Sequence, residues 1–185
     1  VFHIPVVRTT EDESLLFWDL PEIWHVRSFA RALVSRANYR IGTGDLDGAI
    51  DDVVACKRLG RHVGSEGNSI EMLVGNSIEE VADSISIAGS LEHPPTEEQL
   101  KRLVKEFDDL PADSDLQKAN LFERYTALDV VQSLAHGKTT FADIDAPDGV
   151  ARQGIDWNVV ARRINSHCDD MAKGVEFLPG SRTRW

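Results

Sequence analysis

Residues 32–59, ALVSRANYRIGTGDLDGAIDDVVACKRL, decide the fold of this chain. Apolar side chains recur at three- and four-residue spacing on both sides of a central GTGD, which is the spacing of one helix face. The glycines of this turn suit a helix C-terminus, and Asp45 can accept a hydrogen bond from an N–H at the start of the next helix. Because the turn is short, we expect two antiparallel neighbouring helices, an αα-hairpin.

Both hairpin helices extend beyond the quoted stretch. The first begins at Pro21, since proline is tolerated in a first helical turn, and runs to about Ile41. The second runs from Leu46 to about His62. Each carries a stripe of residues that we expect to be buried: Val26, Phe29, Ala30, Leu33, Ala37 and Ile41 in the first, and Leu46, Ala49, Ile50, Val53, Cys56 and Leu59 in the second.

Capping residues and prolines divide the rest of the chain into four more helices. Asn68 and Thr96 each precede Glu or Gln by three residues, which is the spacing of a capping box. Prolines at 94–95 and 111 interrupt helical segments. Asp156 is a plausible N-cap for the last one. The predicted helices are residues 69–91, 96–110, 114–137 and 157–175.

These elements predict an all-α fold with about six helices, joined mainly by short loops and packed as antiparallel hairpins. The arrangement would be either an α-α superhelix or an irregular bundle. The chain has 185 residues, a length that suits one domain. We therefore predict a single helical domain over residues 21–178, an extended or irregular arm over 1–20 and a tail over 179–185.

The chain is acidic, with a formal net charge of -11. Runs such as EEVAD and EFDDLPADSD are typical of a solvated face. Negative charge repels phosphate backbones, so we do not expect a nucleic-acid partner. A basic or neutral protein partner, or no particular partner, fits better, and the oligomeric state stays open. No apolar run approaches the ~20 residues of a membrane helix, so we expect no membrane contact within this chain. Cys56 and Cys168 are too few for a disulfide framework, and both are predicted to be reduced core residues.

The hairpin resembles a tetratricopeptide unit. GDLDGAI is its closest match, and Ala37, Gly44, Ala49, Val53 and Cys56 occupy positions where that repeat has small or apolar residues. Arg40 stands where the repeat has an aromatic residue, and no proline closes the unit. A second unit is not readable, and repeat arrays usually need about three or more. The resemblance therefore implies a TPR-like packing of the helix pair and does not imply a peptide-binding groove.

A longer resemblance covers most of the chain. The segments ARALVSRANYRIGTGDLDGAIDDVVACKRLGRHVG, SIEMLVGNSIEEVA, LFERYTALDVVQSLA and IDWNVVARR are similar to an uncharacterised family of helical proteins from planctomycete bacteria. Tyr125 stands where that family more often has Phe. The resemblance implies fold and lineage without an activity. Some relatives have a hydrophobic segment upstream, which implies that this chain is the soluble part of a membrane-anchored protein.

Motifs for metals, cofactors and catalysis are weak or missing in the sequence. The six histidines form no HExxH pair, and the His167–Asp170 segment holds ligand types on diverging helix faces. DIDAPDG, residues 143–149, departs from the spacing of a calcium loop, and we favour a turn stiffened by Asp and Pro. There is no phosphate-binding P-loop and no GxSxG elbow. We predict no metal, no cofactor and no catalytic residue.

The fifth predicted helix contains LFERYTALD, in which Glu123 and Arg124 interrupt a segment that is apolar on nearly every side. At about 100° a residue, Glu123 projects from the middle of the face formed by Leu116, Ala119, Ala127, Val130 and Leu134. A helix that is apolar almost all round is usually buried. A buried carboxylate must be paired, protonated or beside a wet cavity, because burying a lone charge is costly.

Two interpretations of Glu123 follow. In the first, Glu71 of the third helix approaches Glu123, and together with Arg124 they form a polar ligand-binding pocket in which one carboxyl pKa is raised. In the second, which we favour, Arg124, Arg31 or Arg36 neutralises Glu123 in a structural network, and Glu71 caps its own helix. The favoured function is accordingly a non-enzymatic protein-interaction or scaffold module. The alternative is a small-ligand-binding or hydrolytic protein with a polar pocket around Glu123.

Overall fold

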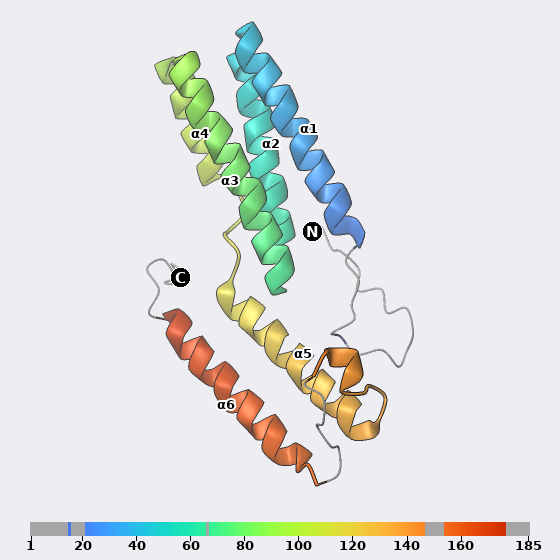
Figure 1. Cartoon of the computed structure of the whole chain (residues 1–185). Helices are drawn as coiled ribbons and strands as arrows, with labels where there is room; N and C mark the ends of the chain where they lie inside the picture. Colours follow the sequence, from blue (N-terminus) through green and yellow to red (C-terminus); the bar gives the residue numbers. More distant parts are fainter. Residues whose placement is uncertain (1–14, 16–20, 66, 147–153, 177–185) are drawn as a thin grey trace. The chain divides into compact units, whose positions relative to one another are not determined.

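A computed structural model describes residue 15 and residues 21–65, 67–146 and 154–176 (Figure 1). Regular secondary structure in these residues is helical, which confirms the prediction of an all-α fold. The helices are α1 (Pro21–Thr43), α2 (Leu46–Gly64), α3 (Ser69–Glu92), α4 (Glu97–Asp108), α5 (Leu116–His136) and α6 (Trp157–Glu176), with a short 3-10 turn, η2 (Ala142–Ile144). No helix in the described residues is long and apolar enough to cross a membrane.

Several helices begin where their capping side chains predict. Asp45 accepts a hydrogen bond from the N–H of Gly48 at 3.1 Å, and Asn68 accepts one from Glu71 at 2.7 Å. Thr96 and Gln99 form a full capping box at the start of α4. Each cap satisfies a backbone donor that has no partner inside the helix. The local sequence therefore determines these boundaries.

The chain forms two compact units, one containing α1 to α4 and the other containing α5, η2 and α6. The prediction of a single domain over residues 21–178 stays a prediction. Of the predicted arm over residues 1–20, nearly all lies outside the described residues, as does the predicted tail over 179–185.

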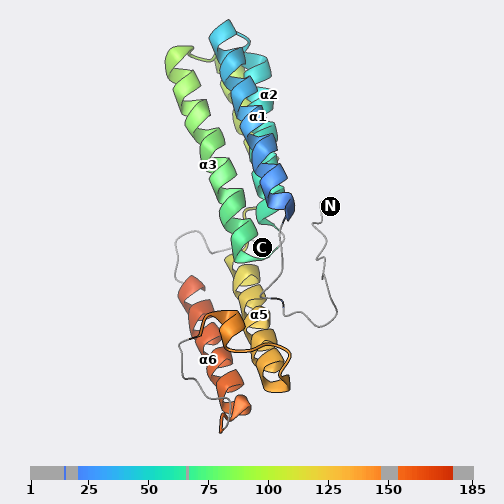
Figure 2. The same cartoon turned by 45° about the vertical axis from the view of Figure 1, so that its right-hand side comes forward.

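The first unit is built around α2, which packs against both α1 and α3 (Figures 1 and 2). The antiparallel α1–α2 hairpin is present as predicted, and α3 also contacts α1. Phe29 is a correction, because its side chain is exposed rather than part of the predicted stripe. The buried core consists of Val26, Ala30, Ala37, Ile41, Ala49, Val53, Cys56, Val63, Ile78, Ala82 and Ile85.

Glycines allow α2 and α3 to approach closely. A Cβ atom added to Gly75 of α3 would lie 2.6 Å from the carbonyl oxygen of Gly60 and 2.7 Å from the backbone nitrogen of Gly64, both in α2. Such distances are too short for a side-chain carbon. The helix backbones are therefore in direct contact at this crossing, and the position of α3 on α2 depends on these small residues.

The second unit pairs α5 with α6. Asp156 caps α6 by accepting hydrogen bonds from the N–H groups of Asn158 and Val159, at 3.0 and 3.2 Å. The ring of Phe141, in the turn before η2, stacks on Trp157 of α6 with centroids 6.3 Å apart. Both cysteines are buried and free, Cys168 in this unit and Cys56 in the first, as expected for core residues.

Candidate functional site

Glu123 lies exposed on α5, so the prediction that it is buried is wrong, although Ala119 and Leu134 of the same predicted face are buried. The position of α6 accounts for part of this. It contacts the flank of α5 that carries Asn120 and Arg124, and Asn120 donates a hydrogen bond from Nδ2 to the carbonyl of Cys168 at 3.2 Å. A helical wheel gives the direction of a side chain but not the direction of the neighbouring helix. An exposed carboxylate needs no partner, so the reason for expecting a pocket beside Glu123 disappears.

Arg124 pairs with Asp169 of α6 and not with Glu123. The hydrogen bond to Asp169 raises the pKa of the Arg124 guanidinium, so its charge is fixed at all ordinary pH values. Arg124 therefore ties α5 to α6. The predicted ligand-binding role of Glu123 and Arg124 stays a prediction.

Glu71, the third residue of the predicted pocket, is buried near the start of α3 in the first unit. Its backbone N–H donates to the side chain of the N-cap residue Asn68, so Glu71 lies in the first turn of α3. That its own side chain caps the helix stays a prediction. Glu71 therefore belongs to the first unit, whereas Glu123 and Arg124 belong to the second.

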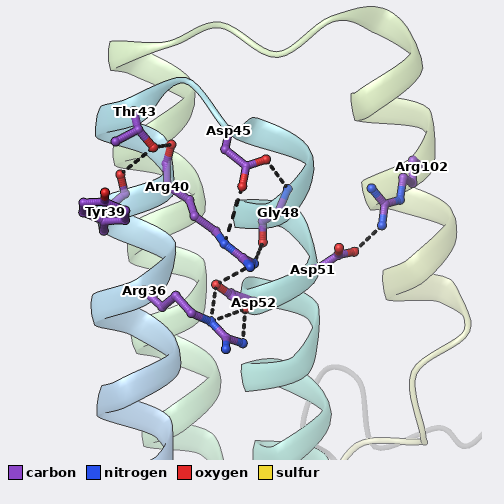
Figure 3. A network of polar contacts seen from close by, with 9 residues as sticks. All are labelled: Arg36, Tyr39, Arg40, Thr43, Asp45, Gly48, Asp51, Asp52 and Arg102. Carbon is purple, nitrogen blue, oxygen red and sulfur yellow. Dashed lines mark hydrogen bonds and ion pairs between the residues drawn. The ribbon is translucent and has the colours of Figure 1, made fainter.

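Asp52 on α2 is another buried carboxylate, and Figure 3 shows the groups that pair with it. Arg36 of α1 donates from Nε to both carboxylate oxygens at 3.0 Å and from Nη2 to Oδ1 at 2.6 Å. Arg40 donates from Nη1 to Oδ2 at 3.0 Å and to the Gly48 carbonyl at 2.7 Å. Two arginines of α1 therefore hold one carboxylate of α2 and fix the hairpin.

A second charged network joins α2 to α3. Arg61 donates from Nε to Glu79 at 2.7 Å and also pairs with Asp113. Lys57 donates to Asp83 at 2.7 Å and lies 3.9 Å from Glu79. Burial raises the pKa of Glu79 above its ordinary value, while Arg61 and Lys57 oppose that shift. These charges are satisfied by each other, so the network is structural in character.

Among the described residues, the other groups that could react or bind a metal ion are either buried in the core or isolated from further groups of that kind. Burial raises the pKa of the Cys56 thiol to about 11, which keeps it protonated and unreactive at neutral pH. Within the described ranges, no three His, Cys, Asp or Glu side chains gather where they could hold a metal ion. Asp143 accepts hydrogen bonds from Thr140 at 2.7 Å, which lower its pKa and stabilise the turn before η2.

A small pocket lies where the α1–α2 turn meets the end of α3 and the start of α4. Its volume is about 40 Å³, room for water molecules but far below the roughly 300–1,000 Å³ of small-molecule sites. Its lining is mainly apolar and includes Ile41, Leu46, Ile50, Leu100 and Leu103. We interpret it as a packing gap beside α4.

The most distinctive surface feature is a row of exposed apolar side chains on α3. Ile70, Leu73 and Val81, with Ser77, Ser84 and Ala88, fall within about 80° of one another around the helix. This stripe lies about 180° from Gly75 and Glu79, which face α2. We call it, together with the adjoining flank of α1, the α1/α3 face. The stripe cannot be recognised from the sequence, because exposed apolar residues on one helix face have the same spacing as buried ones.

The adjoining flank of α1 can be identified from the arginines that turn away from it. Arg36 and Arg40 point toward Asp52 of α2, as Figure 3 shows. Trp24, Arg27, Arg31 and Asn38 lie about 180° from those two arginines around the helix. Half-buried Val34 and Val74 pack against the core beside this surface, one from α1 and one from α3. The α1/α3 face thus combines apolar side chains of both helices.

Comparison with known proteins gives no assignment, because no family, no curated protein and no solved structure matches this chain. The resemblances to the tetratricopeptide unit and to the planctomycete proteins therefore stay predictions.

Proposed function

We propose that this chain is a non-enzymatic protein-interaction module that binds its partner on the α1/α3 face. The observation that carries the proposal is the exposure of Ile70, Leu73 and Val81 on α3 together with Trp24 on α1. Between 46% and 69% of each of these side chains is open to solvent. Single exposed apolar residues are ordinary, but several along one face indicate an interaction surface. Burying these groups against a partner is favourable, at roughly 25 cal/mol per Å² of apolar area.

The rigidity of the first unit supports this role. The Asp52 network fixes α1 on α2, and the close glycine contacts fix α3 on α2. Both helices of the face are therefore held in place before any partner arrives. A pre-organised surface loses less conformational entropy on binding. The alternative, a ligand pocket around Glu123, has less support because that side chain is exposed.

A selection experiment tests the proposal. The full chain would be exposed to a displayed library of random peptides of about 12 residues, and the retained pool would then be tested on two variants. Leu73→Ser with Val81→Ser alters the face. Leu121→Ser with Tyr125→Ser alters exposed apolar residues of α5 and is the control.

We expect the pool to bind the control as it binds the parent chain and to bind the face variant at least about tenfold more weakly. Circular dichroism should show that both variants keep their helical content, since exposed substitutions usually change stability by about 0.5 kcal/mol or less. A library from which nothing is enriched would overturn the proposal. Equal binding to both variants would overturn it as well.

A further inference from the structure

The charge of the α1/α3 face differs from that of the whole chain. Residues 23–43 of α1 contain four arginines and neither aspartate nor glutamate, in a chain whose net charge is -11. Arg36 and Arg40 both pair with Asp52, and Arg40 also pairs with Asp45. Arg27 and Arg31 remain, and both are exposed on the flank that adjoins α3.

These two arginines have no carboxylate partner within ion-pair distance among the described residues. Arg27 instead lies over the ring of Trp24, with its guanidinium carbon 5.9 Å from the ring centroid. Such a cation–π contact keeps the guanidinium on the apolar surface and leaves its N–H groups free to donate. Arg31 follows one helical turn later, so the two positive charges form a short row along α1.

The central positions of the α3 stripe carry no charge. Positions 70, 73, 77, 81, 84 and 88 are Ile, Leu, Ser, Val, Ser and Ala, of which Ser77 is half-buried and the others are exposed. Glu80 lies at the outer edge of this stripe, and Asp83 is already paired with Lys57. The α1/α3 face therefore presents two positive charges on α1 beside a stripe whose central positions are uncharged and whose far edge carries Glu80.

We infer that the partner segment is acidic and carries apolar side chains. Its aliphatic or aromatic groups would cover Ile70, Leu73 and Val81, while its carboxylates would accept hydrogen bonds from Arg27 and Arg31. Arginine suits this role because its planar guanidinium can pair with a carboxylate through two parallel bonds. The inference rests on the proposed function and specifies the chemistry of its partner. It reverses the expectation of a basic or neutral partner, because net charge does not describe a single face.

The composition of the selected peptides tests this inference separately from the proposed function. The library would offer Asp, Glu, Lys and Arg at equal frequency at its polar positions. We expect the pool that binds the α1/α3 face to be enriched in Asp and Glu beside Leu, Ile or Phe. A pool that depends on Leu73 and Val81 but is neutral or basic would overturn the inference while leaving the proposed function intact.

Charge reversal provides the second readout. Arg27→Glu with Arg31→Glu should weaken binding of an acidic pool peptide by roughly tenfold or more, and raising the salt concentration should weaken binding to the parent chain. Arg162→Glu with Arg163→Glu is the matched control, because it makes the same charge change at exposed positions of α6. Equal losses in the two variants would overturn the inference, since they would indicate a general charge effect.

Two other occupants would produce different results. If the α1/α3 face binds membranes, the parent chain will sediment with vesicles of anionic lipid and will not bind the acidic peptide. If the face binds a second copy of the chain, ultracentrifugation will show a dimer that becomes monomeric in the variant Leu73→Ser with Val81→Ser. Either result would overturn the inference.

Discussion

At the scale of single residues, Asp52 is the group on which the first hairpin depends most. It is 2% exposed, and its carboxylate is held by Arg36 and Arg40 from the neighbouring helix. A buried ion pair is not by itself evidence of high stability, because removing charges from water is costly. The geometry of these ion pairs nevertheless fixes how α1 is aligned along α2, since both arginines must reach the same carboxylate.

Replacing Asp52 with asparagine keeps the shape of the side chain and removes its charge. We expect Asp52→Asn to lower the free energy of unfolding by about 1–3 kcal/mol, because two guanidinium groups lose a charged acceptor. Urea unfolding followed by circular dichroism measures this. The control is Asp51→Asn, one residue earlier, which removes only an exposed pair with Arg102 and should cost about 0–1 kcal/mol. If the two substitutions lower the free energy of unfolding equally, the buried network contributes no more to stability than an exposed ion pair does.

Glu79 makes stability depend on pH. Because burial raises its pKa above the ordinary 4.5, the folded chain holds this proton at pH values where the unfolded chain has lost it. The contribution of Glu79 to the free energy of unfolding is therefore lost as the pH rises from the ordinary pKa of a glutamate through the raised pKa of Glu79. We expect the free energy of unfolding of the parent chain, minus that of Glu79→Gln, to decrease as the pH rises through this range. Unfolding curves collected at several pH values across the range measure the difference. A difference that grows with pH would contradict the assignment.

The buried charges also show what the sequence could and could not predict. Asp52 lies three residues after Ala49 and four before Cys56, both in the predicted stripe, so its burial was readable from spacing. Glu123 had the same kind of signal and proved exposed. The difference lies in which face of each helix meets a neighbour. That depends on tertiary packing, which periodicity within one helix does not contain.

At the scale of helices, boundaries were the most predictable feature. Caps such as Asp45, Asn68 and Thr96 act through hydrogen bonds within three residues, so the sequence contains the whole interaction. The crossing of α2 and α3 was not predictable in the same way. It requires Gly60 and Gly64 to meet Gly75, and no local rule pairs these three positions.

The crossing can be tested at Gly75. We expect Gly75→Ala to destabilise the chain by about 1–3 kcal/mol, because the new methyl group would press on the backbone of α2. Gly42→Ala is the control, since its methyl group meets nothing within 4 Å. That substitution should leave stability unchanged or raise it by about 0.5–1 kcal/mol through helix propensity. Thermal unfolding of both variants measures the effects, and a stabilising Gly75→Ala would mean that the helices are further apart than described.

At the scale of the whole molecule, the first unit has a core of its own. The buried cluster of α1, α2 and α3 contains residues from those helices alone, and its partly buried contacts add Phe107 of α4. We therefore expect a fragment of residues 20–115 to fold by itself. Circular dichroism should show a helical spectrum and a single cooperative transition on heating. A fragment that is unfolded would show instead that its core needs the second unit.

The central claim, that the α1/α3 face binds a partner, is tested most directly by mapping where a bound peptide lies. A peptide from the selected pool would carry a photoreactive residue, and cross-linked sites on the unmodified chain would be identified by mass spectrometry. We expect adducts on residues 70–88 of α3 and 24–38 of α1. Adducts concentrated on α4, α5 or α6 would contradict it.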